Sequence, residues 1–404
     1  MKKYSSLFTL FTVFFFCTIS LNAVDFGLVL SQNVESNVPT SNIEETSFDN
    51  ITTVLMPRFS APFVGKGYLY ISGAISYEAD SSIAVPELTR TEIFLKGEYA
   101  NLNVGRIFYN DPLGLTASGL FDGAQVSFIT NNGNIRATGL YTGLLYRKRA
   151  LITMSPDELK NSHDKVDYDD FDNTYYAPRR ILAALDYDHP SLGGFIDLKT
   201  SILTQFDVSG ENLNSQYFTA ALYIPIKSLI FNLGGCFELI EYNDETTPAF
   251  VTDIGLTFIL PTKLAKRIKL SWKYSSGVSE DKTIGAFLPI TTVSQGEIVE
   301  AKLSGLSLFS LDFTGRLAKS LSANTAFTYF IRNDLGTYRY YPVTGGDSQG
   351  HLLGAEIFGK LVWTITSGIR LNIGTGAFIP ALGDAAPDAD VLWRTKLNLA
   401  FSIY

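Results

Sequence analysis

The chain has 404 residues, of which 46% are apolar and 18% are charged, and its formal net charge is −8. This composition is too apolar and aromatic for a disordered chain, and the acidity argues against a nucleic-acid partner. The 21 Tyr and 29 Phe greatly outnumber the three Trp and three Met. Such a bias is typical of strands and of the aromatic girdles of membrane barrels.

The N-terminus has the pattern of a secretory signal peptide. Lys2 and Lys3 precede an apolar stretch that runs from Tyr4 to about Ile19, and Ala23 offers a small residue before a cleavage point. We therefore expect residues 1–23 to be removed and residues 24–404 to form the mature protein. Cleavage would also leave Cys236 as the single cysteine, so no intramolecular disulfide is expected.

After residue 23, no stretch has the roughly 18 consecutive apolar residues of a membrane helix. Only helices and closed barrels satisfy every backbone polar group inside lipid. If the mature chain spans a membrane, it must do so as a closed β-barrel.

Residues 267–275 illustrate an alternation that recurs along the whole chain. Arg267, Lys269 and Lys273 share one parity, whereas Leu270 and Trp272 share the other. A period of two places all the charge on one face of a strand. Since a soluble sandwich also alternates, this pattern alone does not decide between the two architectures.

The connections between such segments alternate between short and long, as in outer-membrane barrels with turns at one rim and loops at the other. Long connections are expected at 34–50, 79–90, 110–122, 148–177, 277–298 and 333–350. Strands are expected near 25–33, 51–60, 67–78, 91–99, 102–109, 123–130, 134–147, 179–187, 194–207, 216–225, 228–242, 249–260, 266–276, 299–314, 321–332, 352–363, 367–379 and 391–403. The predicted fold is all-β: a membrane-spanning antiparallel up-and-down β-barrel of about 18 strands, with 16 as the other possible count.

The chain resembles Gram-negative-type outer-membrane porins of the general or sugar-type superfamily. The resemblance rests on Val104-Gly105-Arg106-Ile107, Asp111-Pro112-Leu113-Gly114 and Phe121-Asp122-Gly123-Ala124. In trimeric porins the third long loop commonly folds inward, and the resemblance implies that Arg106, Asp111 and Asp122 line a constriction. The alternative interpretation is ordinary turn chemistry at Asp-Pro and Asp-Gly. Tyr404, although terminal and aromatic, is one residue out of phase with the apolar face of the last strand.

Charged residues in the middle of strands are expected to face water, because Arg or Lys facing lipid at the bilayer midplane costs about 2–4 kcal/mol. Together with the three residues above, they form the candidate pore lining: Glu92, Lys96, Glu98, Asp186, Asp197, Lys199, Lys269, Lys273, Glu300, Lys302, Asp312, Glu356, Lys360, Arg370, Arg394 and Lys396. A transverse field that selects solutes and a solvated wall without selectivity both fit this set.

No catalytic or metal-binding constellation is visible, since the three histidines are scattered over loops and turns. We expect no enzyme activity, no metal and no cofactor. The leading hypothesis is an outer-membrane porin of a diderm bacterium that passes small hydrophilic solutes by passive diffusion. Its partners would be outer-membrane lipids and those solutes, and family analogy suggests a homotrimer. The alternative is a barrel-type surface adhesin or structural protein that acts through its long loops. A transporter for hydrophobic substrates and a secreted all-β enzyme are further alternatives.

Overall fold

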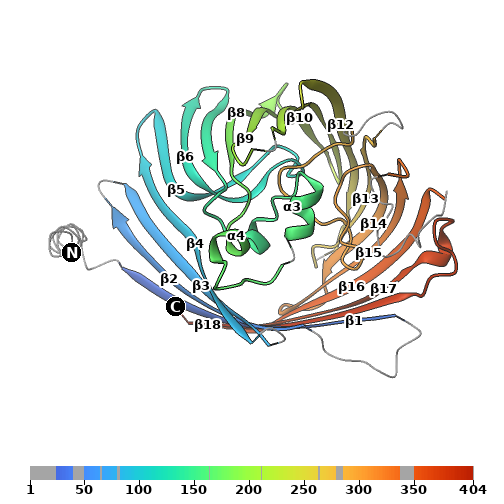
Figure 1. Cartoon of the computed structure of the whole chain (residues 1–404). Coiled ribbons are helices and arrows are strands. Elements are labelled where there is room, and N and C mark those ends of the chain that lie inside the picture. The colour runs from blue at the N-terminus through green and yellow to red at the C-terminus, as the bar shows by residue number, and fades with distance from the viewer. Residues whose placement is uncertain are drawn as a thin grey trace.

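The computed structural model describes residues 24–39, 50–63, 66–79, 82–162, 164–210, 212–262, 264–278, 285–336 and 350–403. They form one closed antiparallel barrel of 18 strands (Figure 1). The strands are β1 (Asp25–Pro39), β2 (Asn50–Phe63), β3 (Gly67–Glu78), β4 (Ile83–Lys96), β5 (Ala100–Asn110), β6 (Ser118–Thr130), β7 (Gly133–Tyr141), β8 (Arg180–Leu192), β9 (Ile196–Asp207), β10 (Asn214–Ile226), β11 (Leu229–Tyr242), β12 (Glu245–Ile259), β13 (Arg267–Ser275), β14 (Leu306–Arg316), β15 (Leu321–Arg332), β16 (Leu352–Thr366), β17 (Ile369–Ile379) and β18 (Leu392–Ile403).

The barrel closes because β1 pairs with β18 as well as with β2. The closing register runs from Leu28 opposite Ile403 to Pro39 opposite Leu392. Closure leaves no strand at the edge of the sheet, which is what a spanning sheet requires. The prediction of an all-β antiparallel barrel of about 18 strands is confirmed.

The alternation predicted from the sequence separates the two faces of the wall. On β13, Leu270 points outward and is 56% exposed, whereas Ser271 is buried toward the interior. On β11 the outward Leu233 is 48% exposed and the inward Cys236 is buried. The outer surface is therefore an apolar band, and the polar side chains gather inside.

Several predicted boundaries are wrong, and in two of them an alternating pattern continues beyond the strand of the wall. The strand expected at 299–314 begins only at Leu306, and the strand expected at 134–147 ends at Tyr141. The loop expected at 79–90 is mostly strand, because β4 begins at Ile83. Pro86 does not break β4, since proline is tolerated where a strand edge has no backbone partner.

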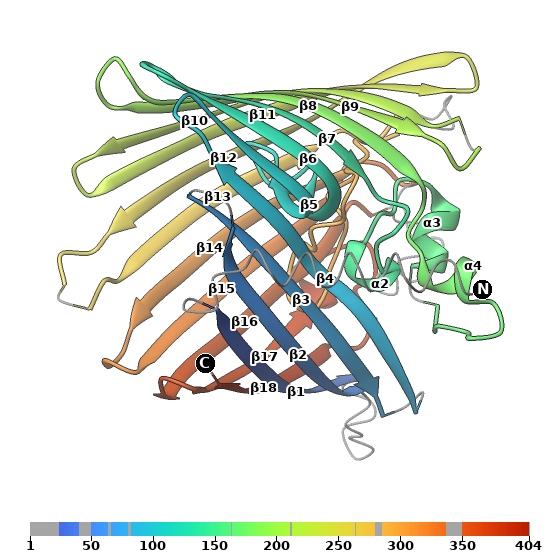
Figure 2. The same ribbon diagram turned by 90° about the vertical axis from the view of Figure 1, so that its left-hand side faces the viewer.

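Three connections at one rim fold into the barrel. We call residues 111–117 the inner loop, residues 142–179 the helical insert and residues 285–304 the crossing segment. The insert carries α2 (Arg147–Ala150), α3 (Pro156–Asn161) and α4 (Phe171–Tyr175), which lie together at one end of the barrel (Figure 2). A short 3₁₀ helix, η3 (Pro380–Leu382), follows β17. Among the described helices, none is long and apolar enough to cross a membrane.

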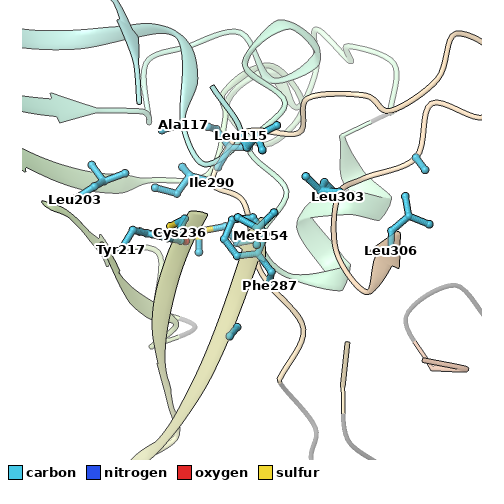
Figure 3. Packing of buried hydrophobic residues seen from close by; sticks show 14 of the residues in the cluster. Leu115, Ala117, Met154, Leu203, Tyr217, Cys236, Phe287, Ile290, Leu303 and Leu306 are labelled. Atoms are coloured by element: carbon cyan, nitrogen blue, oxygen red, sulfur yellow. The ribbon is translucent and has the colours of Figure 1, made fainter. Parts of the chain in front are cut away.

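The folded-in connections build a hydrophobic core inside the barrel. Leu115 of the inner loop, Met154 of the insert and Phe287 of the crossing segment are all buried. Figure 3 shows them beside Tyr217 of β10 and Cys236 of β11. Each buried aliphatic or aromatic side chain contributes about 1.5–3 kcal/mol, so these segments are held inside the barrel by packing.

Two sequence predictions lie outside the described residues. These are the signal peptide, residues 1–23, and the terminal aromatic Tyr404.

Candidate functional site

The interior face of β13 to β18 carries mainly basic side chains. They are Arg267, Lys269 and Lys273 of β13, Arg316 at the end of β14, the buried Arg332 of β15, Lys360 of β16, Arg370 of β17, and Arg394 and Lys396 of β18. The acidic residues in these six strands are Asp312 of β14 and Glu356 of β16, and Glu356 is only 3% exposed. This side of the interior therefore presents a positive surface.

Acidic side chains on the other side of the interior are largely enclosed. Glu92 of β4 is 2% exposed, forms an ion pair with Arg90 and accepts a hydrogen bond from the Tyr68 hydroxyl (2.9 Å). Asp186 of β8 is fully buried and accepts a hydrogen bond from Tyr109 (3.1 Å). These two carboxylates are therefore shielded from the open interior.

The first half of the crossing segment is tied to the far wall and to the other inward segments. The Leu288 N–H donates to the Glu238 carboxylate of β11 (2.8 Å), and the Ile290 N–H donates to the Thr116 carbonyl of the inner loop (2.8 Å). The Thr292 N–H then donates to the Leu151 carbonyl of the helical insert (2.9 Å).

The second half of the crossing segment reaches the basic wall. Lys273 of β13 donates to the Gln295 side chain (2.9 Å). The Glu356 carboxylate of β16 then accepts the N–H groups of residues 297, 298 and 299, at 2.7, 3.0 and 3.0 Å. A segment that joins β11 to β13, β16 and β18 narrows the interior.

The tip of the crossing segment lies against β18. Two backbone hydrogen bonds between Gln295 and Ala301 close a small hairpin around the tip. At the tip, Glu300 contacts the guanidinium of Arg394 (2.8 Å) and the ammonium of Lys396 (3.3 Å), and Glu297 contacts Lys396 (3.1 Å). Acidic and basic groups thus meet at the narrowed part of the interior.

Asp111 organises the inner loop from within. Its carboxylate accepts backbone N–H groups from Leu113, Gly114, Thr116 and Ala117 at 2.8–3.1 Å. Burial raises the pKa of this carboxyl, and the four N–H donors oppose that rise. Asp111 is 1% exposed and therefore shapes the inner loop without facing the open interior.

Arg106 and Asp122 lie in the wall between β4, β5 and β6. Their ion pair is bidentate, with N–O distances of 2.9 and 2.8 Å. The guanidinium also donates to the backbone carbonyls of Leu88 and Leu144. The structure therefore places this pair on the strands that flank the inner loop, Arg106 on β5 and Asp122 on β6.

A buried ion pair fixes the helical insert to the wall. Ser155 caps α3 in a capping box with Glu158, and the Glu158 carboxylate contacts the Arg180 guanidinium (3.1 and 2.5 Å). Both side chains are nearly inaccessible, at 6% and 0% exposed. Lys302 of the crossing segment donates to the Thr153 carbonyl, so the insert and the crossing segment are joined.

The other predicted pore residues divide between the wall and the connections. Those on the interior face of strands are Glu92, Lys96, Asp186, Asp197, Lys199, Lys269, Lys273, Asp312, Glu356, Lys360, Arg370, Arg394 and Lys396. Glu98 lies in the short turn between β4 and β5. Glu300 and Lys302 lie in the crossing segment, before β14 begins at Leu306, rather than on a strand of the wall.

Two residues of the narrowed region were not predicted. Glu35 contacts Arg394 (3.2 Å), and it lies on the part of β1 that continues beyond the predicted strand end at residue 33. Glu297 belongs to a connection with no strand pattern. The alternation of Asn33, Glu35 and Asn37 was the one sequence pattern that could have predicted Glu35. No local sequence pattern marks Glu297.

Among the described residues, no group of three or more His, Cys, Asp or Glu could hold a metal ion.

The sequence matches no protein-family model and no curated protein. The fold, in contrast, is similar to solved outer-membrane proteins of Pseudomonas aeruginosa. OccK2 (OpdF) in complex with glucuronate has a TM-score of 0.64 at 10% identity, over 94% of this chain and 98% of that chain. OccK5 (OpdH) has a TM-score of 0.63 at 11% identity, over 95% and 99%. The outer membrane protein OpdK has a TM-score of 0.61 at 8% identity, over 95% and 99%. The chain therefore has the 18-stranded barrel fold of these proteins.

Proposed function

We propose that this chain is an outer-membrane channel of a diderm bacterium through which small hydrophilic solutes diffuse, with a preference for anions. The observation that carries the proposal is the basic interior face of β13 to β18 inside a closed barrel of 18 strands. Barrels of 16 to 18 strands are wide enough for an aqueous channel, and the inward segments would reduce that width to the size of small solutes.

The preference for anions follows from the distribution of charge. Lys360 and Arg370 are exposed on the interior face, whereas Glu92, Asp186 and Glu356 are buried. Low-dielectric walls lined with one sign of charge raise the local concentration of counter-ions. The exposed basic part of the interior wall would therefore enrich anions over cations, and the glucuronate in the OccK2 structure is consistent with a fold that admits small anionic solutes.

The test is a planar-bilayer recording with the purified, refolded protein. We expect discrete channel currents and, in a tenfold KCl gradient, a reversal potential of the sign that indicates chloride preference. A fully folded barrel that carries no current would refute the channel, and a potassium preference would refute its anion selectivity.

A matched pair of variants separates the interior charge from net charge. Lys360→Gln removes an exposed ammonium inside the barrel, and Lys319→Gln removes one from the short turn between β14 and β15. We expect the first to lower the chloride preference about twofold and the second to leave it unchanged. Equal effects would mean that the wall does not set selectivity.

The adhesin alternative relied on the long connections at 148–177 and 277–298. Met154, Val166, Phe287 and Ile290 of these connections are buried inside the barrel. These side chains show that the described parts of both connections take part in internal packing, which favours the channel over the adhesin. The homotrimer stays a prediction from family analogy.

A further inference from the structure

Three carboxylates converge on two cations where the crossing segment meets the wall. Arg394 of β18 contacts Glu35 of β1 (3.2 Å) and Glu300 (2.8 Å). Lys396, two residues further along β18, contacts Glu300 (3.3 Å) and Glu297 (3.1 Å). This cluster holds one more acidic than basic group, so one carboxylate can leave while both cations keep a partner.

The exposure of these groups is unequal. The Glu297 and Glu300 side chains are 46% and 43% exposed, whereas those of Arg394 and Lys396 are 9% and 25% exposed. The carboxylates therefore cover the cations on the side of the open interior. A solute anion that moves along the basic wall meets these carboxylates before it reaches the cations.

Of the three acidic residues, Glu300 is the one whose position is least fixed by other contacts. Glu35 lies within the β1–β18 ladder, directly opposite Lys396. Glu297 is tied by its N–H to Glu356 and by its carbonyl to Arg394 (2.7 Å). Glu300 has a φ of 48°, in the left-handed region that residues other than glycine seldom adopt. Its two ion pairs offset that unfavourable backbone conformation.

We propose that Glu300 is a resident counter-anion at an anion station formed by Arg394 and Lys396, and that a solute carboxylate takes its place during passage. The proposal rests on the proposed channel function. While Glu300 moves aside, Glu35 stays with Arg394 and Glu297 stays with Lys396, so neither cation is left as an unpaired buried charge during the exchange. The Glu356 anchor would hold the tip of the crossing segment in place while the Glu300 side chain moves aside.

Glu300→Gln is the direct test, with succinate as the probe in bilayer recordings of chloride current. Removal of the competing carboxylate should let succinate bind more tightly, and we expect the half-blocking concentration to fall about tenfold. Glu241→Gln is the matched control, because it removes a carboxylate from the outer face of β11 and not from the cluster. It should change the half-blocking concentration by less than about twofold. An unchanged value in the Glu300→Gln channel, or an equal fall in both variants, would overturn the proposal.

A second variant and a double variant show whether the change in succinate block comes from the missing carboxylate or from altered folding. Glu300→Gly also removes the carboxylate and relieves the positive φ, so it should reproduce the result of Glu300→Gln in a well-folded channel. In a Lys396→Gln background, Glu300→Gln should shift the half-blocking concentration by less than about threefold, because part of the station is already absent. Full additivity would refute the shared station. A wild-type barrel that conducts no current before succinate is added would instead refute the channel function.

Discussion

The Arg106 guanidinium, paired with Asp122 of β6, also contacts β4 and the helical insert. β4 and β5 pair from Lys96 opposite Asn101 up to Thr91 opposite Arg106. Beyond that point, the Arg106 side chain donates to the Leu88 carbonyl of β4 and to the Leu144 carbonyl of the helical insert, while its ion pair holds Asp122 of β6. Arg106 therefore joins β4 to β6 just where the backbone ladder between β4 and β5 ends.

Further along the same edge of β4, two tyrosines of the insert donate hydrogen bonds to carbonyls that have no partner on β5. The Tyr168 hydroxyl donates to the Ala84 carbonyl, and the Tyr175 hydroxyl donates to the Pro86 carbonyl (2.8 Å). Together with Arg106, they satisfy every second carbonyl from residue 84 to residue 88. Side chains of the insert thus replace a neighbouring strand, which avoids the exposed edge that sheets tolerate poorly.

We predict that Arg106→Gln destabilises the barrel by about 3 kcal/mol. The substitution leaves the Asp122 carboxylate without its bidentate partner in a site where Arg106 is only 5% exposed. Urea unfolding of the refolded barrel in lipid vesicles measures this loss. Arg316→Gln, at the exposed end of β14, is the control and should cost less than about 0.5 kcal/mol. Equal stability of the two variants would show that the wall does not depend on the pair.

Gly234 of β11 should control the position of the inner loop. A Cβ added at Gly234 would lie 2.2 Å from Cδ2 of Leu113. Alanine could be accommodated by a turn of the Leu113 side chain, but Gly234→Leu should push the inner loop away from the wall and toward the open interior. We expect a conductance at least about twofold lower.

The matched test for that displacement is a compensating variant. Leu113→Ala vacates the space into which the new side chain points, so the double variant should recover most of the wild-type conductance. If Leu113→Ala deepens the loss instead, the contact between these two residues does not position the loop.

The sequence contains enough information to predict the wall. Alternation such as that of residues 267–275 needs only neighbours in the chain, and β3 and β15 were predicted with the observed bounds. Closure and strand order then follow from hairpins between successive strands. Where a tertiary contact replaces a hairpin, the local pattern misleads, and Pro86 at the partner-free edge of β4 is the clearest case.

The candidate site was less predictable because its key contacts cross the barrel. Lys302 and Glu300 have the spacing of strand residues, but Glu300 has a positive φ and both lie in the crossing segment. The three N–H donors to Glu356 are backbone groups about 60 positions away in the sequence. Every residue type except proline carries a backbone N–H, so the sequence gives no sign of these contacts. Such contacts depend on how far the crossing segment reaches, and only the folded barrel determines that.

The docking of the crossing segment on the helical insert should strengthen as pH rises. Burial lowers the pKa of the Lys302 ammonium to about 8, although the Glu158 and Glu238 carboxylates oppose that shift. Between pH 8 and the usual lysine value near 10.5, the unfolded chain binds more protons than the folded one, so stability increases with pH across this window. After allowance for screening at a partly exposed site, the gain should be about 1–2 kcal/mol.

The measurement is the difference in unfolding free energy between wild type and Lys302→Gln at pH 7.5 and at pH 10. The substitution removes the titrating group, so the wild type should gain stability relative to the variant as pH rises. A difference that does not change with pH, or that changes in the opposite sense, would show that the Lys302 ammonium carries no such penalty.

Glu356 should hold the crossing segment at its working position. Its carboxylate accepts three consecutive backbone N–H groups, and hydrogen bonds to a charged acceptor contribute about 1.5–3 kcal/mol each. Glu356→Ala removes all three, so the tip that carries Glu297 and Glu300 should become mobile and the channel current should become noisier, with more frequent partial closures. Glu241→Gln, on the outer parity of β11, is the control and should leave the current trace unchanged.

Limited proteolysis between residues 293 and 301 gives a second readout of the same release. The wild-type tip is closed by the backbone hydrogen bonds between Gln295 and Ala301 and should resist cleavage. In Glu356→Ala, cleavage should be at least about tenfold faster, because the local opening that exposes the backbone loses its main opposing interactions. A quiet, protease-resistant Glu356→Ala channel would mean that the contacts of Arg394 and Lys396 suffice to hold the tip, and that the wall cations position the crossing segment without the carboxylate of β16.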